Sequence, residues 1–350
     1  MAGEPRGAGG VRAVVTRAAT MPATFRAYVA ERLEDRVERG VRDLTADDLP
    51  AGEVVVRVDW SGVNYKDGLA TRFDGKVARI SPLVPGIDLA GEVVSSDEAS
   101  IRPGDAVLAH GYDLGVSRHG GYAEYQRVPA GWVVLLPKGL SARDAMAIGT
   151  AGFTAAMSVA ALEARGLRMD AGPVLVTGAS GGVGTTGLGI LAARGYEVWA
   201  ATGKADEHDR LRGLGAAGFV DREEMTAVPR PLESARWAGA IDAVGGPAMP
   251  YLLSTLMPGA GVASVGNAGG HGFSSTVLPF ILRGVAVLGM NSVPVPIEER
   301  RALWNRLAGD YRPRGLGEDV TEVTLDTLDG ALDGIVAGRA RGRWVVRVGS

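Results

Sequence analysis

One stretch of the chain combines a short apolar strand, a glycine-dense turn and the start of a helix, and this combination constrains the fold most. Residues 174–177 predict a buried strand, 178–184 contain the glycines, and 185–194 predict a helix. This order suits a dinucleotide pyrophosphate, because glycines let the backbone approach the phosphates and a helix N-terminus offers free N–H groups. The glycines depart from the strict Gly-x-Gly-x-x-Gly spacing, so the prediction of a dinucleotide site depends on the flanking strand and helix as well. The alternative is an ordinary strand–turn–helix connection.

Composition narrows the class of protein further. A chain of 350 residues with 46% hydrophobic residues predicts two domains with separate cores. The net charge of -3 gives no basic field, so we expect neither nucleic acid nor a membrane as a partner. Zero cysteines exclude disulfides, iron–sulfur clusters and thiolate-held zinc, and with only four histidines we expect no metal. No apolar run of membrane-spanning length and no hydrophobic signal core is evident, so we expect a cytoplasmic protein.

The character of the sequence changes near residue 141. Residues 1–24 are rich in Ala, Gly and Arg without periodicity, and we expect a disordered extension there. From residue 25, short strand patterns separated by glycine and proline turns predict a β-rich domain, with 120–125 as one of its strands. The apolar run 142–164 predicts a helix interrupted at 149–154.

The second half of the chain alternates strands and helices. This alternation up to about residue 290 predicts a doubly wound parallel sheet, and hence an α/β fold. Two amphipathic helices and a closing strand follow, and we expect them to pack back on the β-rich domain. The nucleotide-binding domain, 148–290, would then be inserted in a domain formed by 25–147 and 291–350.

The residues at the end of the second strand of this sheet indicate which dinucleotide binds. An acidic residue there would bind the 2′-hydroxyl of NADH, but the chain has Thr202, Gly203 and Lys204. A hydroxyl, an exposed N–H and an ammonium suit the 2′-phosphate of NADPH, and Arg222, after the third strand, offers a second cation. The alternative is that Lys204 and Arg222 are ordinary solvated charges.

Several motifs resemble the medium-chain dehydrogenase/reductase superfamily. They are PGIDLAGEV at 85–93, GDAV at 104–107 and ASGGVG at 179–184. Zinc-binding members use cysteine and histidine ligands, so this cysteine-free chain resembles the zinc-free, quinone-oxidoreductase-like branch. Longer strings resemble the bacterial acrylyl-CoA reductase group, and these are NYKDGLA at 64–70, IGTAGFTA at 148–155, WAGAID at 237–242 and PFILRGV at 279–285.

The resemblance implies a fold, a reaction and a set of contacts. The fold would be a GroES-like β-rich domain with an inserted Rossmann-type domain, and the protein a homodimer. The reaction would be the NADPH-dependent reduction of acrylyl-CoA, a CoA thioester, to propanoyl-CoA. The cofactor contacts carried over by position are Tyr65, Ser180, Gly181, Gly182, Val183, Thr202, Gly203, Lys204, Arg222, Asn267 and Ser292.

Hydride transfer to Cβ of an enoyl thioester leaves charge on the thioester oxygen and requires a proton at Cα. Tyr65 is the first candidate for a catalytic role and Asn64 the second. The alternative for Tyr65 is a packed aromatic ring. We expect Asp88 to brace the strands of its domain or the Asn64 loop, and Lys66 and Asp67 could equally form a surface ion pair.

Three functions remain open from the sequence. The first is acrylyl-CoA reduction. The second is the NADPH-dependent reduction of quinones or enones, with the same fold and cofactor. The third is a non-catalytic NADPH-binding protein with a regulatory role, against which the intact glycine turn and Asn64–Tyr65 stretch argue.

Overall fold

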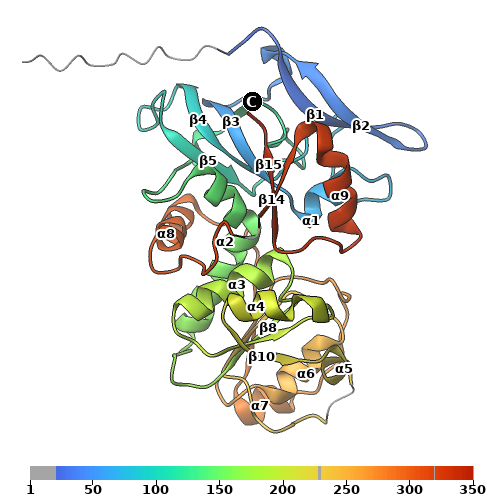
Figure 1. Ribbon diagram of the computed structural model, residues 1–350, viewed down its shortest axis with the longest axis vertical. Coiled ribbons are helices and arrows are strands. Elements are labelled where there is room, and N and C mark those ends of the chain that lie inside the picture. The colour runs from blue at the N-terminus through green and yellow to red at the C-terminus, as the bar shows by residue number, and fades with distance from the viewer. Residues whose placement is uncertain (1–20, 228–229, 319, 350) are drawn as a thin grey trace, which may run out of the picture.

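The computed structural model describes residues 21–227, 230–318 and 320–349 (Figure 1). Most of the predicted disordered extension, residues 1–20, lies outside the described residues. The first regular element is a hairpin of two antiparallel strands, β1 (Phe25–Arg32) and β2 (Val37–Leu44).

The β-rich domain contains a seven-stranded sheet in the order β14-β15-β3-β4-β5-β7, with β6 paired to β3. Its strands are β3 (Val54–Gly62), β4 (Asp88–Ser96), β5 (Ala106–His110), β6 (Tyr125–Val128), β7 (Val134–Leu135), β14 (Val320–Thr324) and β15 (Arg343–Arg347). Three β-branched side chains of β3, those of Val54, Val56 and Val58, are fully buried and form the middle of this core.

The predicted strand at 120–125 is wrong over most of its length, because the chain there is irregular and β6 begins only at Tyr125. Packing explains the difference. A Cβ on Gly120 would lie 2.2 Å from the carbonyl oxygen of Gly86, and one on Gly121 would lie 2.1 Å from that of Asp88. The two glycines let this segment lie flat against a neighbouring backbone instead of pairing as a regular strand.

The second domain is a doubly wound parallel sheet, as predicted. The strand order is β10-β9-β8-β11-β12-β13, which is the Rossmann order with β8 as its first strand. The strands are β8 (Val174–Thr177), β9 (Val198–Ala201), β10 (Ala216–Val220), β11 (Gly239–Asp242), β12 (Gly261–Ser264) and β13 (Ala286–Gly289). The helices that connect them are α3 (Gly182–Ala193), α4 (His208–Gly213), α5 (Arg222–Thr226), α6 (Ala248–Thr255) and α7 (Leu278–Arg283).

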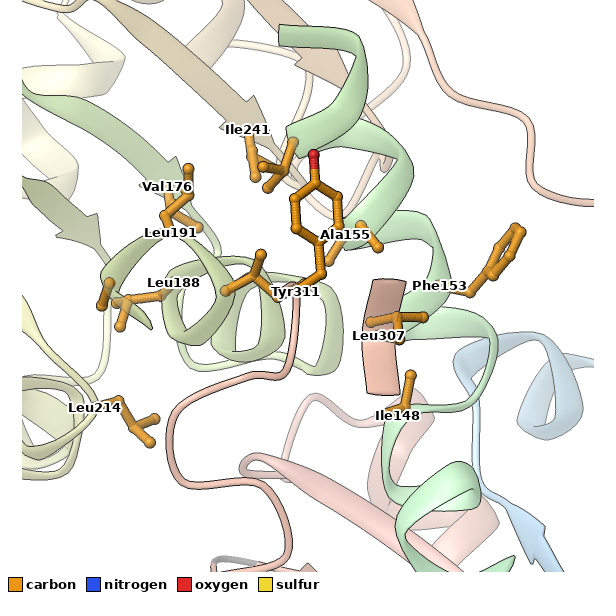
Figure 2. Packing of buried hydrophobic residues seen from close by; sticks show 14 of the residues in the cluster. Ile148, Phe153, Ala155, Val176, Leu188, Leu191, Leu214, Ile241, Leu307 and Tyr311 are labelled. Atoms are coloured by element: carbon orange, nitrogen blue, oxygen red, sulfur yellow. The ribbon is translucent and has the colours of Figure 1, made fainter. Parts of the chain in front are cut away.

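A long helix, α2 (Ala142–Ala164), joins the two domains. The predicted interruption is a single kink at Gly149, whose φ of 51° is left-handed, and the helix continues beyond it. Figure 2 shows Phe153 and Ala155 of α2 in one core with Leu188 of α3 and Ile241 of β11. The same core includes Tyr311, which follows the tail helix α8 (Ile297–Ala308).

The expectation that no apolar run reaches membrane-spanning length is wrong for α2. This helix has 23 residues and contains an 18-residue window with a mean hydropathy of 1.6, so it is long and apolar enough to cross a bilayer. However, 78% of its apolar window is buried inside the protein, as in the core helix of a folded domain.

The tail returns to the first domain, as predicted. Strand β15 pairs antiparallel with β3 and parallel with β14, so the last strand completes the first sheet. The preceding helix, α9 (Leu328–Val336), packs on α1 (Tyr65–Ala70), where a Cβ on Gly68 would lie 2.5 Å from Val336 Cγ2 (Figure 1). A helix more than 250 residues away in the sequence therefore holds α1 in place.

Candidate functional site

The glycine turn after β8 has the geometry that a phosphate group requires. Gly178 has a left-handed φ of 59°, and a Cβ on Gly184 would lie 2.3 Å from the carbonyl oxygen of Gly178. Helix α3 starts directly after Gly181, and among the described residues no side chain caps its first turn. Its leading N–H groups therefore face the turn without a side-chain acceptor, an arrangement that fits a dinucleotide pyrophosphate.

Polar side chains gather at the end of β9, next to this turn. The hydroxyls of Ser180 and Thr202 are 3.0 Å apart, and the backbone N–H of Lys204 donates to Thr202 Oγ1 over 3.2 Å. Arg222 begins α5 and lies beside Gly203, because a Cβ on Gly203 would be 3.6 Å from Arg222 Cδ. The Thr202 hydroxyl, the backbone of Lys204 and the side chain of Arg222 thus lie around the end of β9, where they fit a 2′-phosphate.

The remaining two cofactor residues carried over by resemblance follow other strands of the parallel sheet. Asn267 is exposed in the loop after β12, and its carbonyl accepts a hydrogen bond from the N–H of Gly270 over 2.9 Å. Ser292 follows β13 and is buried, and its hydroxyl accepts a hydrogen bond from Thr154 over 2.9 Å. Both lie at the carboxyl edge of the sheet, where nucleotides bind in such folds.

The two candidate catalytic residues begin helix α1 and differ sharply in exposure. The side chain of Tyr65 is 53% exposed, whereas Asn64 is buried. The Asn64 amide donates to Asp88 Oδ2 over 2.7 Å and accepts from Arg343 Nη1 over 3.3 Å. Asn64 is therefore fixed by protein groups on both sides, while Tyr65 is free to meet a ligand.

Asp67 is not part of a surface ion pair, because its side chain is fully buried. It accepts hydrogen bonds from the backbone N–H of Asn64 over 2.8 Å and from that of Ile87 over 2.9 Å. Burial, together with the nearby carboxylate of Asp88, raises the pKa of Asp67 to about 7. Asp67 therefore caps α1 and connects this helix to Ile87, the residue directly before strand β4.

Asp88 braces the Asn64 loop, as expected, and is fully buried. Besides Asn64 it accepts a hydrogen bond from Thr150 Oγ1 over 2.5 Å, next to the kink in α2. Glycines make room for it on both sides, because a Cβ on Gly62 or Gly149 would lie 2.6 Å or 2.5 Å from Asp88 Oδ2. The carboxylate thus connects β4, α2 and the start of α1.

Arg343 supplies the positive charge for this buried acidic pair. It is only 7% exposed, and its Nη2 lies 3.9 Å from Asp88 Oδ2. Burial lowers the pKa of its guanidinium, and the charges of Asp88 and Asp67 oppose that effect. Its Nη1 is also 3.0 Å from the position that a Cβ on Gly182 would occupy. Arg343 therefore lies between Asn64 and the phosphate turn and brings the two halves of the site together.

The histidines near this region have structural partners. His110 is fully buried, accepts from Trp304 Nε1 over 2.9 Å and lies 3.2 Å from Thr150 Oγ1. Burial and the neighbouring charge of Arg300 hold the pKa of His110 well below its usual value, so the ring is neutral. Arg300 also donates to the carbonyl of Ser292 over 3.2 Å and thereby fixes the segment after β13.

The chain resembles known families and proteins over most of its length. Residues 50–138 match the alcohol dehydrogenase GroES-like domain, and 182–308 match the zinc-binding dehydrogenase family. An acrylyl-CoA reductase of Ruegeria pomeroyi is 47% identical over 327 residues, covering 93% of this chain and 99% of that protein. The chain belongs to the medium-chain dehydrogenase/reductase family.

Solved structures agree with this membership of the medium-chain dehydrogenase/reductase family. An oxidoreductase of Salmonella enterica, solved with NADP, has a TM-score of 0.90 and is 42% identical, covering 93% of this chain and 100% of that chain. A Bacillus subtilis protein, named provisionally as a quinone oxidoreductase and solved with NAD, has a TM-score of 0.91 at 45% identity, with the same coverage. The chain is thus an oxidoreductase with a GroES-like domain and a Rossmann-type domain.

The cysteine ligands of zinc-binding medium-chain dehydrogenases/reductases have no counterpart here, since the sequence contains no cysteine. Across the described residues there is no group of three or more His, Asp or Glu side chains arranged to hold a metal ion. The prediction that the site works without a metal stays a prediction.

The buried position of Arg343 gives a prediction about stability. We expect Arg343→Met to lower the free energy of unfolding by about 3–5 kcal/mol, because it leaves the carboxylates of Asp88 and Asp67 without their cation. Since Asp67 takes up a proton as the pH falls through about 7, the loss should be larger at about pH 8.5 than at about pH 5.5. Urea denaturation at both pH values measures it.

Arg347→Met is the matched control, because Arg347 is exposed on the same strand, β15. Its free energy of unfolding should stay within about 0.5 kcal/mol of the parent chain. A loss for Arg343→Met that is small, or equal at both pH values, would contradict the assigned role of the guanidinium.

Proposed function

We propose that this protein reduces the carbon–carbon double bond of acrylyl-CoA to propanoyl-CoA with NADPH. The observation that supports the proposal is the position of Arg343, which contacts Asn64, the neighbour of the exposed Tyr65, and also lies beside Gly182 in the phosphate turn. The substrate comes from the similarity to the Ruegeria acrylyl-CoA reductase, which extends over almost the whole of both chains. A cytoplasmic location is part of the same proposal.

The proposed cofactor contacts form three groups. The backbone of Gly181, Gly182 and Val183 would bind the pyrophosphate at the start of α3. The hydroxyls of Ser180 and Thr202, the N–H of Gly203 and the cations of Lys204 and Arg222 would bind the adenosine 2′-phosphate. Asn267 and Ser292 would line the carboxyl edge of the sheet toward the nicotinamide, together with Tyr65 from the other domain. NADPH, when bound, supplies the hydride.

The protein's part in the reaction is to orient the substrate and to stabilise charge on the thioester oxygen. The side chain of Tyr65 is exposed, and the Asp67 cap fixes the backbone at the first turn of α1, so we infer that the Tyr65 hydroxyl donates to a bound ligand. Asn64 acts as a positioning residue, since its amide is occupied by Asp88 and Arg343. A donor at the thioester oxygen lowers the barrier to hydride addition at Cβ.

A substrate panel tests the reaction. We expect NADPH oxidation with acrylyl-CoA to exceed that with 1,2-naphthoquinone by at least about tenfold in kcat/KM, a difference of about 1.4 kcal/mol in transition-state binding. The reverse order would favour the quinone or enone reductase, a candidate supported by the name of the Bacillus relative. Tight NADPH binding without turnover of any short enoyl-CoA or quinone would favour the regulatory role.

Tyr65→Phe tests the catalytic assignment. We expect kcat/KM for acrylyl-CoA to fall by about tenfold to a hundredfold, because one hydrogen-bond donor to the developing oxyanion is lost. The fold should be unaffected, since more than half of the ring is exposed. Tyr125→Phe, in strand β6 of the same domain, is the control and should leave the rate unchanged. An unchanged kcat/KM for Tyr65→Phe would remove it from the catalytic residues.

We also propose that the protein is a homodimer that pairs through the edge strand β13. Within the described part of the sheet, β13 pairs only with β12. Large apolar side chains are exposed on β13 and on the preceding helix and loop, namely Val287 (40%), Ile281 (68%), Leu282 (63%) and Val277 (65%). An open edge beside exposed apolar side chains favours pairing with a second copy.

Ile281→Glu should convert the dimer to a monomer of 36.2 kDa, because it places a charge in the proposed apolar interface. Light scattering during size-exclusion chromatography measures the mass. Met169→Glu, which changes a side chain that is 60% exposed outside this patch, should leave the mass unchanged. A parent chain that elutes as a monomer would refute the proposed dimer.

A further inference from the structure

A segment of the tail, residues 338–342, lies across the end of β9. Lys204 Nζ donates to the carbonyl oxygens of Gly338 over 2.8 Å and of Ala340 over 3.1 Å. The N–H of Gly342 donates to the carbonyl of Ser180 in the phosphate turn over 3.2 Å. This tail segment, which leads from α9 into the first sheet, therefore contacts both sides of the proposed 2′-phosphate position.

The tail segment also provides charge. Asp206 and Glu207 follow Lys204 closely in the sequence, in a short 3-10 helix (Ala205–Glu207). Arg341 binds both of them, with Nη2 2.5 Å from Asp206 Oδ2 and Nη1 3.2 Å from Glu207 Oε1. The other oxygen of Glu207 accepts from Arg210 Nε over 2.6 Å. Two carboxylates that would repel a phosphate are thus matched by two guanidinium groups.

We propose that Arg341 is a specificity-determining residue, which maintains the preference for the 2′-phosphorylated cofactor by neutralising Asp206 and Glu207. The inference rests on the proposed placement of the 2′-phosphate at Thr202, Lys204 and Arg222. Without Arg341, the negative charge of Asp206 would lose its ion-pair partner. Asp206 lies two residues after Lys204, the proposed phosphate contact, so its charge would then repel a phosphate that carries close to two negative charges. NADH has only a hydroxyl at that position, so its affinity would not depend on Arg341.

The contacts of Lys204 agree with this role. An ammonium group has three N–H donors, and the carbonyls of Gly338 and Ala340 accept two of them. The third remains for the phosphate, so Lys204 is held in position by the tail segment and does not have to leave it. Arg341 and Lys204 thus act on the same phosphate, one by removing repulsion and the other by contact.

The test is the dissociation constant of each cofactor, measured by nucleotide fluorescence without substrate. We expect Arg341→Ala to raise the Kd for NADPH by about tenfold, and to change the Kd for NADH by less than about twofold. Asp206→Asn should restore NADPH affinity in the Arg341→Ala background, because it removes the charge that Arg341 balanced. The NADPH effect should shrink as salt is raised.

Arg301→Ala is the matched control, since Arg301 also forms an exposed ion pair, with Glu298 at 2.7 Å, but lies on α8. It should leave both constants unchanged. Equal weakening of NADPH and NADH by Arg341→Ala, or no rescue by Asp206→Asn, would overturn the proposal. An unaltered NADPH constant would overturn it too.

Lys204→Ala separates this result from a failure of the cofactor placement. We expect it to weaken NADPH binding without affecting NADH. If it weakens both equally while Arg341→Ala remains selective, Lys204 does not contact the phosphate, and the charge role of Arg341 stands because it requires only that the phosphate lie near Asp206. Neither measurement needs acrylyl-CoA, so both are independent of the proposed reaction.

Discussion

The buried guanidinium of Arg343 is the interaction on which the arrangement of the two domains depends. Arg343 belongs to β15 in the first sheet, and its guanidinium lies beside the carboxylate of Asp88. The guanidinium also donates to the amide oxygen of Asn64 and lies next to Gly182 at the start of α3. Its Nε also donates to the carbonyl of Ala147 in α2 over 2.9 Å. Burying such a group is costly, and satisfying it fixes one geometry of its neighbours. Charge and hydrogen bonding at Arg343 therefore help to set the position of α1 relative to the phosphate turn, alongside the apolar core that the two domains share.

Much of the fold could be predicted because its signals are local. The strand, glycine turn and helix around Gly178–Gly184 adjoin in sequence, and the alternation of strands and helices after it admits few topologies. The short elements were missed for an equally physical reason. Helix α5 has five residues and α7 has six, too few for a helical period to be visible, and β14 lacks the alternation of apolar and polar side chains because Thr321 and Glu322 are adjacent. Their structure is determined by the packing around them.

The residues of the candidate site also fall into those whose position could be predicted from the sequence and those whose position could not. Ser180, Thr202, Lys204 and Arg222 follow predicted strands, and their meeting at one sheet edge could be inferred from topology alone. Asp67 could not be placed, since a charged residue next to a lysine is usually at the surface, and its burial depends on acceptors and donors in other elements. Arg343 and Asn64 are 279 residues apart, and Arg341 and Asp206 are 135 apart. No local sequence pattern marks two residues that lie so far apart in the chain. The interpretation of the phosphate site from its cations therefore left out the nearby carboxylates of Asp206 and Glu207, and also Arg341, which forms ion pairs with both.

The return of the tail has a consequence for how the protein is made. A ribosome adds β15 only after the whole parallel sheet and its glycine turn, so these are synthesised before Arg341 and Arg343. Synthesis of β15 then lets it pair with β3 in the first sheet. A chain that stopped before residue 341 would contain every strand of the parallel sheet but neither of these two arginines.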